Sequence, residues 1–158
     1  MLFMFTVLLI NCSFALVAVA KDHDDVASLF KNIARVLNVV GGSCKHRDIL
    51  REIQAAHMKV ALEIGELYSG QGLNQETSLR RAGDTRWGSH YQTLVSLSTM
   101  FEVVTDVLEI VGKDSSNSDQ RDEVKSLLDI MQSFEFVFFL ILLRNILAIT
   151  NELSQVLQ

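Results

Sequence analysis

The longest gap between helical patterns in this chain ends in Asp84-Thr85-Arg86-Trp87-Gly88-Ser89-His90-Tyr91. This stretch contains the only tryptophan and joins a run of basic residues to a new helical pattern. An indole beside a guanidinium can stack on a base while the cation holds a phosphate. The alternative is that Trp87 anchors a hydrophobic core, and chemistry alone favours it because tryptophan is highly buried on average.

Composition narrows the class of protein. The chain has 158 residues, which is enough for one domain with a real core, and 49% of them are hydrophobic. It contains no proline, which suits helices. The formal charge of −5 means that any contact with nucleic acid must be local. Cys12 and Cys44 are too few for a disulfide framework, so we expect free thiols in a reducing compartment.

Two apolar stripes with helical spacing precede the tryptophan stretch. Gly41 and Gly42 end the first pattern and Ser43 can cap the second, which predicts an antiparallel helical hairpin. The first stripe consists of Val26, Phe30, Ile33, Leu37 and Val40, and the second of Leu50, Ile53, His57, Val60, Ile64 and Leu67.

Two further helical patterns follow. The third stripe closes at Gly112, and Ser118 or Asp119 can start the last helical region. We expect polar loops at about 69–88 and 112–122. The predicted fold is therefore mainly α, with a helical region over 22–158 after a short apolar segment over 1–21. The third stripe consists of Tyr91, Leu94, Phe101, Val104, Leu108 and Val111, and the fourth of Val124, Leu127, Met131 and Phe134.

Residues 136–143 are apolar on all sides of a helix. A membrane span is one interpretation, but the run is short and lies between Glu135 and Arg144. A helix buried on all sides in a larger protein explains the pattern better. The segment therefore implies either a partner, which includes self-association through this C-terminal helix, or a missing remainder of the domain.

Residues 1–20 carry no charge. The run from Leu2 to Ile10 resembles the centre of a signal peptide, and Ala18-Val19-Ala20 fits a cleavage site. No Lys or Arg precedes the run, so the positive region of a signal peptide is missing. A buried strand or helix is the alternative, and the pattern alone leaves both open.

No assembled active site is visible in the sequence. Cys44 and His46 are one residue apart, but no second pair completes a four-ligand zinc set. His57 lies on an apolar stripe and is expected at the core or its boundary. No glycine-rich phosphate loop or nucleophile elbow is present. We therefore expect no metal site, no cofactor and no small-molecule ligand.

Basic residues suggest one local binding surface. Those at the second helix start and before the tryptophan can together form a phosphate-binding face. The alternative is a solvated face offset by Asp48, Glu52 and Asp84, and the charge pattern does not decide between them. The candidate DNA-contacting residues are Arg86, Trp87, Arg80, Arg81, Lys45 and Arg47.

Four stretches carry a family resemblance: residues 15–21 (ALVAVAK), 38–45 (NVVGGSCK), 84–91 (DTRWGSHY) and 134–153. They resemble hAT-superfamily transposases, in particular the plant proteins described as zinc finger MYM-type protein 1-like or TTF-type zinc finger proteins. The stretch with Arg86 and Trp87 is the most specific. The resemblance spans nearly everything after about Phe14.

The resemblance implies an incomplete part of a larger enzyme. In that family an RNase H-like core holds divalent metal with two aspartates and a glutamate, and a helical insertion interrupts the core. This chain resembles the start of the insertion with a scrap of core before it. By the same resemblance, Trp87 is expected near the active site, stacking on flanking DNA.

The departures from the family are large. Residues 1–13 replace an expected Cys-x-x-His-type motif with an apolar run, and the first-aspartate strand, zinc finger, glutamate helix and dimerisation region have no counterpart. Two-metal chemistry needs the full carboxylate set. We therefore expect a truncated protein that is inactive alone and that binds DNA weakly or a longer transposase-like partner in the nucleus or cytoplasm. The alternative is a small secreted or membrane-anchored helical protein.

Overall fold

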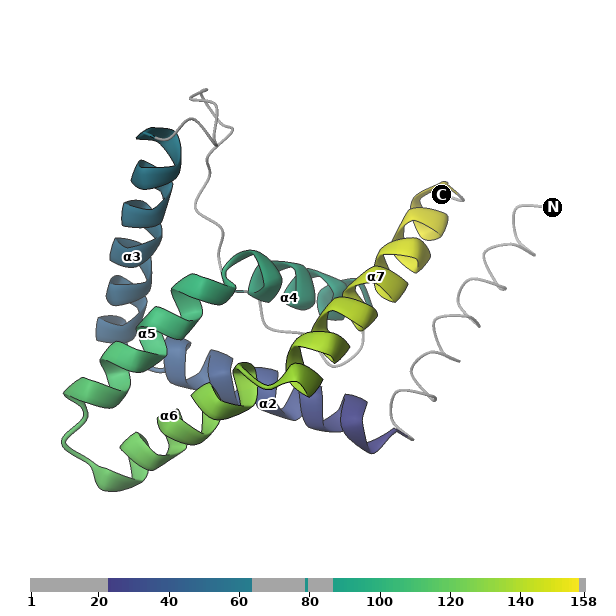
Figure 1. Cartoon of the computed structure of the whole chain (residues 1–158). Helices are drawn as coiled ribbons and strands as arrows, with labels where there is room; N and C mark the ends of the chain where they lie inside the picture. The colour runs from purple at the N-terminus through teal and green to yellow at the C-terminus, as the bar shows by residue number, and fades with distance from the viewer. Residues whose placement is uncertain (1–22, 64–78, 80–86, 157–158) are drawn as a thin grey trace.

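The computed structural model describes residues 23–63, 79 and 87–156. These residues form six helices and no strand, so the prediction of a mainly α protein is confirmed (Figure 1). The predicted N-terminal segment and most of the predicted loop at 69–88 lie outside the described residues. The helices are α2 (Asp24–Gly41), α3 (Cys44–Glu63), α4 (Trp87–Thr99), α5 (Phe101–Asp114), α6 (Ser118–Met131) and α7 (Phe134–Val156).

The junction between α2 and α3 forms as the sequence predicts. Helix α2 ends at Gly41, and a Cβ placed on Gly42 would lie only 2.5 Å from the Asn38 carbonyl oxygen. Glycine therefore suits this turn. The Ser43 hydroxyl oxygen accepts a hydrogen bond of 3.0 Å from the His46 backbone N–H, which caps the start of α3.

The predicted antiparallel hairpin of α2 and α3 is wrong. Figure 1 shows that α3 runs at a steep angle to α2 instead of folding back along it. Helix α3 packs more extensively against α5 than against α2. Leu50 and Ile53 in the first half of α3 pack on the core, whereas Val60 is 55% exposed. The stripe on α3 is therefore covered only where α5 and α2 reach it.

The third apolar stripe belongs to two helices instead of one. Helix α4 ends at Thr99, the buried Met100 breaks the path, and α5 begins at Phe101. Helix α4 packs mainly on α7, whereas α5 packs on α3 and α6, so one straight helix does not serve both contacts. Gly112 does not end the helix, because α5 continues to Asp114 and Gly112 lies close against Val124 of α6.

The predicted loop at 112–122 is too long: α5 ends at Asp114 and α6 begins at Ser118, so only residues 115–117 connect them. Helix α6 begins at Ser118 as predicted, but Asn117 is its cap: the side-chain oxygen accepts from the Asp119 backbone N–H at 2.9 Å. The last region also divides into two helices. Ser133 starts α7 by accepting a hydrogen bond from the Phe136 N–H at 3.2 Å.

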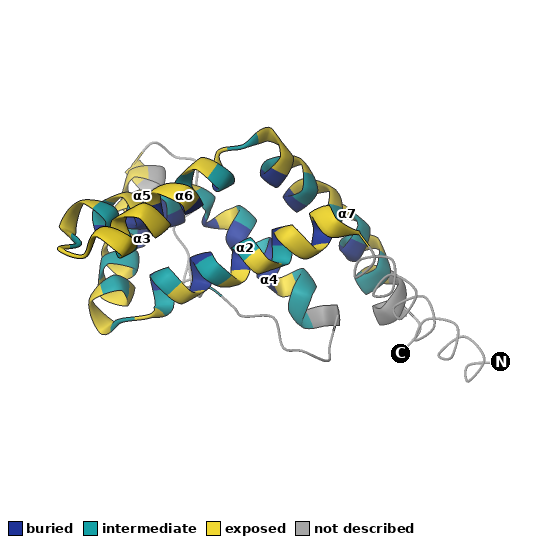
Figure 2. Ribbon diagram, turned by 90° about the horizontal axis from the view of Figure 1, so that it is seen from below, coloured by how far each residue is buried: buried dark blue, intermediate teal, exposed yellow. Residues whose placement is uncertain are grey.

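The core lies where α2, α4, α5 and α6 meet, and one face of α7 closes it (Figure 2). Helix α2 contacts α3, α5, α6 and α7. Among the side chains of α7 that the structure describes, residues 134–152, the buried ones are Phe136, Leu140 and Leu147. The other sides of α7 are open within the described chain, because only α4, with smaller contacts from α2 and α6, packs against α7. The expectation that a larger protein or a partner buries this helix stays a prediction.

Candidate functional site

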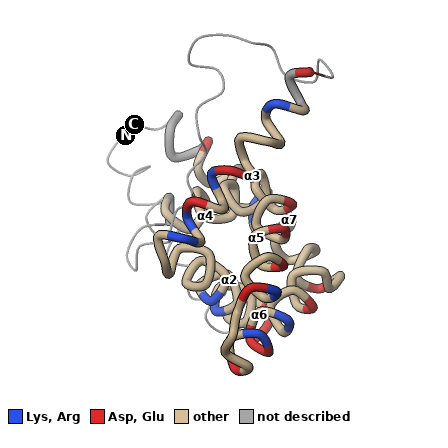
Figure 3. The backbone as a smooth tube through the Cα atoms, turned by 90° about the vertical axis from the view of Figure 1, so that its left-hand side faces the viewer, with Lys and Arg blue, Asp and Glu red and all other residues tan. Residues whose placement is uncertain are grey.

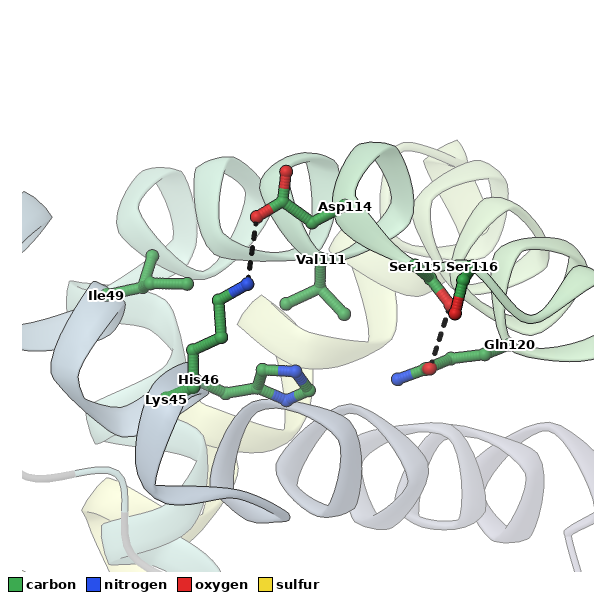
Figure 4. A pocket seen from close by; sticks show the side chains of 8 residues that line it. All are labelled: Lys45, His46, Ile49, Val111, Asp114, Ser115, Ser116 and Gln120. Atoms are coloured by element: carbon green, nitrogen blue, oxygen red, sulfur yellow. Dashed lines mark hydrogen bonds and ion pairs between the residues drawn. The ribbon is translucent and has the colours of Figure 1, made fainter.

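A small polar cavity lies where the first turn of α3 faces the connection between α5 and α6. Its volume is about 190 Å³, which is small for an organic ligand. Figure 4 shows Lys45 and His46 entering from α3, opposite Asp114 of α5 and Gln120 of α6. This cavity contains Lys45, one of the predicted DNA-contacting residues.

The Lys45 ammonium group is already paired. Its Nζ lies 3.1 Å from Oδ2 of Asp114, and both side chains are more than half exposed. An exposed pair of this kind contributes about 0–1 kcal/mol to stability. The pairing reduces the charge that Lys45 offers to a phosphate, so this cavity is not a built anion site.

His46 joins the start of α3 to the end of α2. Its Nδ1 lies 2.7 Å from the Val39 carbonyl oxygen. Because a carbonyl oxygen only accepts hydrogen bonds, Nδ1 is the protonated ring nitrogen. This contact and the Ser43 cap fix the direction in which Lys45 and the next turn project.

Arg47 is the more available cation. It is exposed, its guanidinium donates to the Cys44 Sγ at 3.2 Å, and no carboxylate among the described residues pairs with it. Arg51, one turn further along, is paired with Asp48 at 3.2 Å. Figure 3 shows the basic residues interspersed with acidic ones along the described helices. The described part of the chain therefore brings together only Lys45 and Arg47 of the predicted DNA-binding set.

The rest of that set is not placed. Arg80, Arg81 and Arg86 lie outside the described residues. Trp87 is the first residue of α4, and its side chain is also outside the description. The predicted DNA face that combines them with Lys45 stays a prediction.

Metal ligands do not converge in the part of the chain that the structure describes: it holds no group of three or more His, Cys, Asp or Glu suited to an ion. Cys44 is a free thiol at the surface. His57 is exposed, not at the core or its boundary as expected, and its Nε2 lies 3.3 Å from Oδ2 of Asp106 on α5. That contact links α3 to α5.

The second candidate surface is the outer face of α7, which we call the α7 stripe. The stripe consists of Phe134, Phe138, Ile141, Leu142 and Ile149, which are 81%, 48%, 45%, 38% and 61% exposed. An apolar strip of this kind marks a contact surface for a protein or a membrane. The sequence identified the apolar run over residues 136–143 and predicted that a partner or a larger protein covers it.

Helix α7 also passes a length and composition test for a membrane span. The candidate span is Phe134–Glu152, with a mean hydropathy of 1.7. Only 17% of its most apolar 18-residue part is buried in the fold. A core helix of a water-soluble protein passes the same test, and Arg144 lies within the span. A charged residue there is costly in lipid.

The described residues therefore form a mainly helical fold with an open apolar face on α7. No protein-family model matches this chain, and no solved structure matches it.

Proposed function

We propose that this chain is a transposase-derived helical protein that acts by associating with a longer transposase-like polypeptide. The observation that carries the proposal is the α7 stripe, whose five large apolar side chains are exposed to solvent. All five residues lie in residues 134–153, which is one of the four stretches that resemble hAT transposases. On this proposal the chain supplies no catalysis of its own.

The packing of α7 supports association through this particular face. Leu140 and Leu147 are buried, so the inner face of the helix is occupied within the chain. The outer face has large aromatic and aliphatic side chains, which are the residue types that anchor protein interfaces. Phe134 and Phe138 stack with ring centroids 5.8 Å apart and form a ready apolar anchor.

The test mixes the purified chain with a purified full-length hAT-type transposase that contains its RNase H-like core. Light scattering after size-exclusion chromatography measures the mass of the complex. Titration of the transposase with the chain measures the affinity. The double variant Phe138→Glu with Ile141→Glu is expected to weaken binding by at least about tenfold, because two anchors are lost. Lys125→Glu on the exposed face of α6 is the matched control and should bind as the native chain does. Equal binding by both variants, or no binding by the native chain, would reject this function.

DNA contact is the second part of the proposal. Arg47 supports it, because its exposed guanidinium has no carboxylate partner among the described residues. We expect the Arg86→Ala, Trp87→Ala double variant to bind hairpin or single-stranded DNA more weakly than the native chain, with Arg51→Ala as the control. Absence of salt-sensitive DNA binding by the native chain at low ionic strength would remove this part of the proposal.

A membrane-anchored or secreted protein is the alternative, and the span test on α7 is the observation that favours it. The association proposal implies a product in the nucleus or cytoplasm, whereas this alternative implies the secretory pathway. A C-terminal fluorescent tag distinguishes them. Cleavage after Ala20 followed by secretion, or retention in membranes after carbonate washing, would establish the alternative.

A further inference from the structure

Four exposed residues of α7 have the spacing of a helix that pairs with another helix. Phe134, Phe138, Ile141 and Asn145 follow one another at steps of four, three and four residues. At about 100° per residue they fall within a sector of about 60°. Alternating steps of three and four residues bring the a and d positions of a coiled coil to one side of a helix. We call these four residues the α7 seam.

The seam lies on the opposite side of α7 from the face that packs on the bundle. Phe136, Leu140 and Leu147 are buried on that inner face, about half a turn around the helix from the seam. Leu142 and Ile149 of the α7 stripe are exposed along one edge of the seam. A partner helix laid along the seam therefore covers the whole stripe without displacing a described helix.

Asn145 is the polar residue at the centre of this exposed apolar surface. Ile141 and Ile149 are exposed one turn before it and one turn after it. Its side-chain amide forms no hydrogen bond with the residues that the structure describes. A wholly apolar partner would bury this amide unsatisfied, which costs free energy. Because a carboxamide both donates and accepts, a second carboxamide at the same level satisfies it.

We propose that two copies of this chain associate through their α7 stripes as a parallel helix pair, with Asn145 of one copy hydrogen-bonded to Asn145 of the other. Two-fold symmetry then brings each apolar residue of the seam against its own counterpart. A single asparagine at an a position fixes the register and the oligomeric state of parallel coiled coils. An antiparallel pair centred on Asn145 also joins the two amides, but it brings the apolar Phe138 level with Glu152.

The pair is expected to be weak. Its five stripe side chains on each copy would bury roughly 500 Å², or about 1,000 Å² in total, at the lower limit of specific interfaces. We therefore expect a monomer at low micromolar concentration and a dimer at several hundred micromolar. The inference goes beyond the proposed function, because it concerns the chain without a transposase, which would compete for the same stripe.

A charge exchange at Asn145 tests the register in the full chain. Sedimentation equilibrium measures self-association from low micromolar to several hundred micromolar concentration. Asn145→Asp and Asn145→Lys should each weaken association at least about tenfold, because like charges then meet across the pair. An equal mixture of the two variants should associate within about threefold of the native chain, because opposite charges meet. The same two changes at Gln92, an exposed amide on α4, are the matched control and should leave association unchanged.

A disulfide experiment determines the direction of the two helices. In a background with Cys12→Ser and Cys44→Ser, one cysteine is introduced by Phe134→Cys or by Lys125→Cys, and each protein is oxidised at several hundred micromolar. A disulfide needs Cα atoms about 4.4–6.8 Å apart, a distance that facing seam positions of a parallel pair provide. Phe134→Cys should therefore cross-link between chains at least about tenfold faster than Lys125→Cys on α6. In the antiparallel pair the two introduced cysteines would lie about 33 Å apart.

Three results would overturn the inference. One is a native chain that stays monomeric at several hundred micromolar, whether or not it binds neutral lipid vesicles. Another is a mixture of the two Asn145 variants that associates no better than either variant alone. The third is equal cross-linking by Phe134→Cys and Lys125→Cys. Transposase binding is measured on a mixture of two different proteins, so its failure is distinguishable from a failure of self-association.

Discussion

Helices α2 and α7 differ in what covers them. Helix α2 has 18 residues and α7 has 23, and α7 is the more apolar of the two. Yet α2 buries six apolar side chains, whereas three are buried among the described side chains of α7. Helix α2 confines its apolar residues to one stripe and has four helices packed against it. Helix α7 has apolar residues on every side, and its outer side meets no described helix. Apolar content therefore does not determine burial, because burial needs a neighbour.

The largest expected difference in stability is between two isoleucine-to-alanine substitutions, one on α2 and one on α7. Ile33→Ala on α2 is expected to lower the free energy of unfolding by about 3–5 kcal/mol, because it leaves a cavity among four helices. Ile141→Ala on the exposed face of α7 should change it by no more than about 0.5 kcal/mol. Urea unfolding followed by circular dichroism measures both. Similar losses at the two positions would mean that the α7 stripe is as fully covered as the core.

A second pair compares the two faces of α7. Leu140→Ala should cost about 2–3 kcal/mol because Leu140 is buried against the bundle. Leu142→Ala, two residues further on, should cost less than about 1 kcal/mol. The same urea titration is used. A larger loss for Leu142 than for Leu140 would mean that α7 is rotated relative to this structure.

Substitutions at the N-cap positions of α7 and α2 should change the free energy of unfolding by smaller amounts. Ser133 caps α7, whereas His23 at the start of α2 makes no side-chain cap hydrogen bond. Ser133→Ala should destabilise the protein by about 1 kcal/mol, and His23→Ser should stabilise it by up to about 1 kcal/mol. Thermal unfolding of the two variants in one buffer checks both signs. A neutral result at Ser133 would show that packing alone holds the start of α7.

The smallest effect should come from the surface ion pair of α2. Arg35 Nε lies 3.7 Å from the Glu123 carboxylate on α6, and neither side chain is buried. Arg35→Met is expected to change the free energy of unfolding by about 0–1 kcal/mol, with the difference shrinking in 1 M salt. Arg121→Met serves as the comparison, because Arg121 donates to the Ser115 carbonyl oxygen instead of a carboxylate. A salt-independent loss above that range at Arg35 would point to lost packing by its aliphatic stem.

Local signals predicted the elements well. Apolar residues at every third or fourth position predicted α2 and the first half of α3, and Gly42 with Ser43 predicted their junction. The breaks at Met100 and at residues 132–133 were missed. Neither position has a strong helix breaker, so the break depends on the directions in which the flanking helices must pack.

The candidate sites were predicted less completely. Lys45 and Arg47 stand together at the start of α3 because two residues separate them on one helix. The pairing of Lys45 with Asp114 spans 69 positions of sequence and has no local signal. The roles of Arg86 and Trp87 stay a sequence-based prediction, since their side chains lie outside the described part.

The sequence by itself determined that the described part of the chain is helical, that Ser43 caps α3 and that the last helix is unusually apolar. These properties depend on side chains within four residues of one another, which any helix brings together. Only the tertiary structure decided that α3 leaves α2 for α5, that the third stripe bends at Met100, and that one face of α7 stays open. Those outcomes depend on which helices compete for the same apolar surface, and that competition involves residues far apart in the chain.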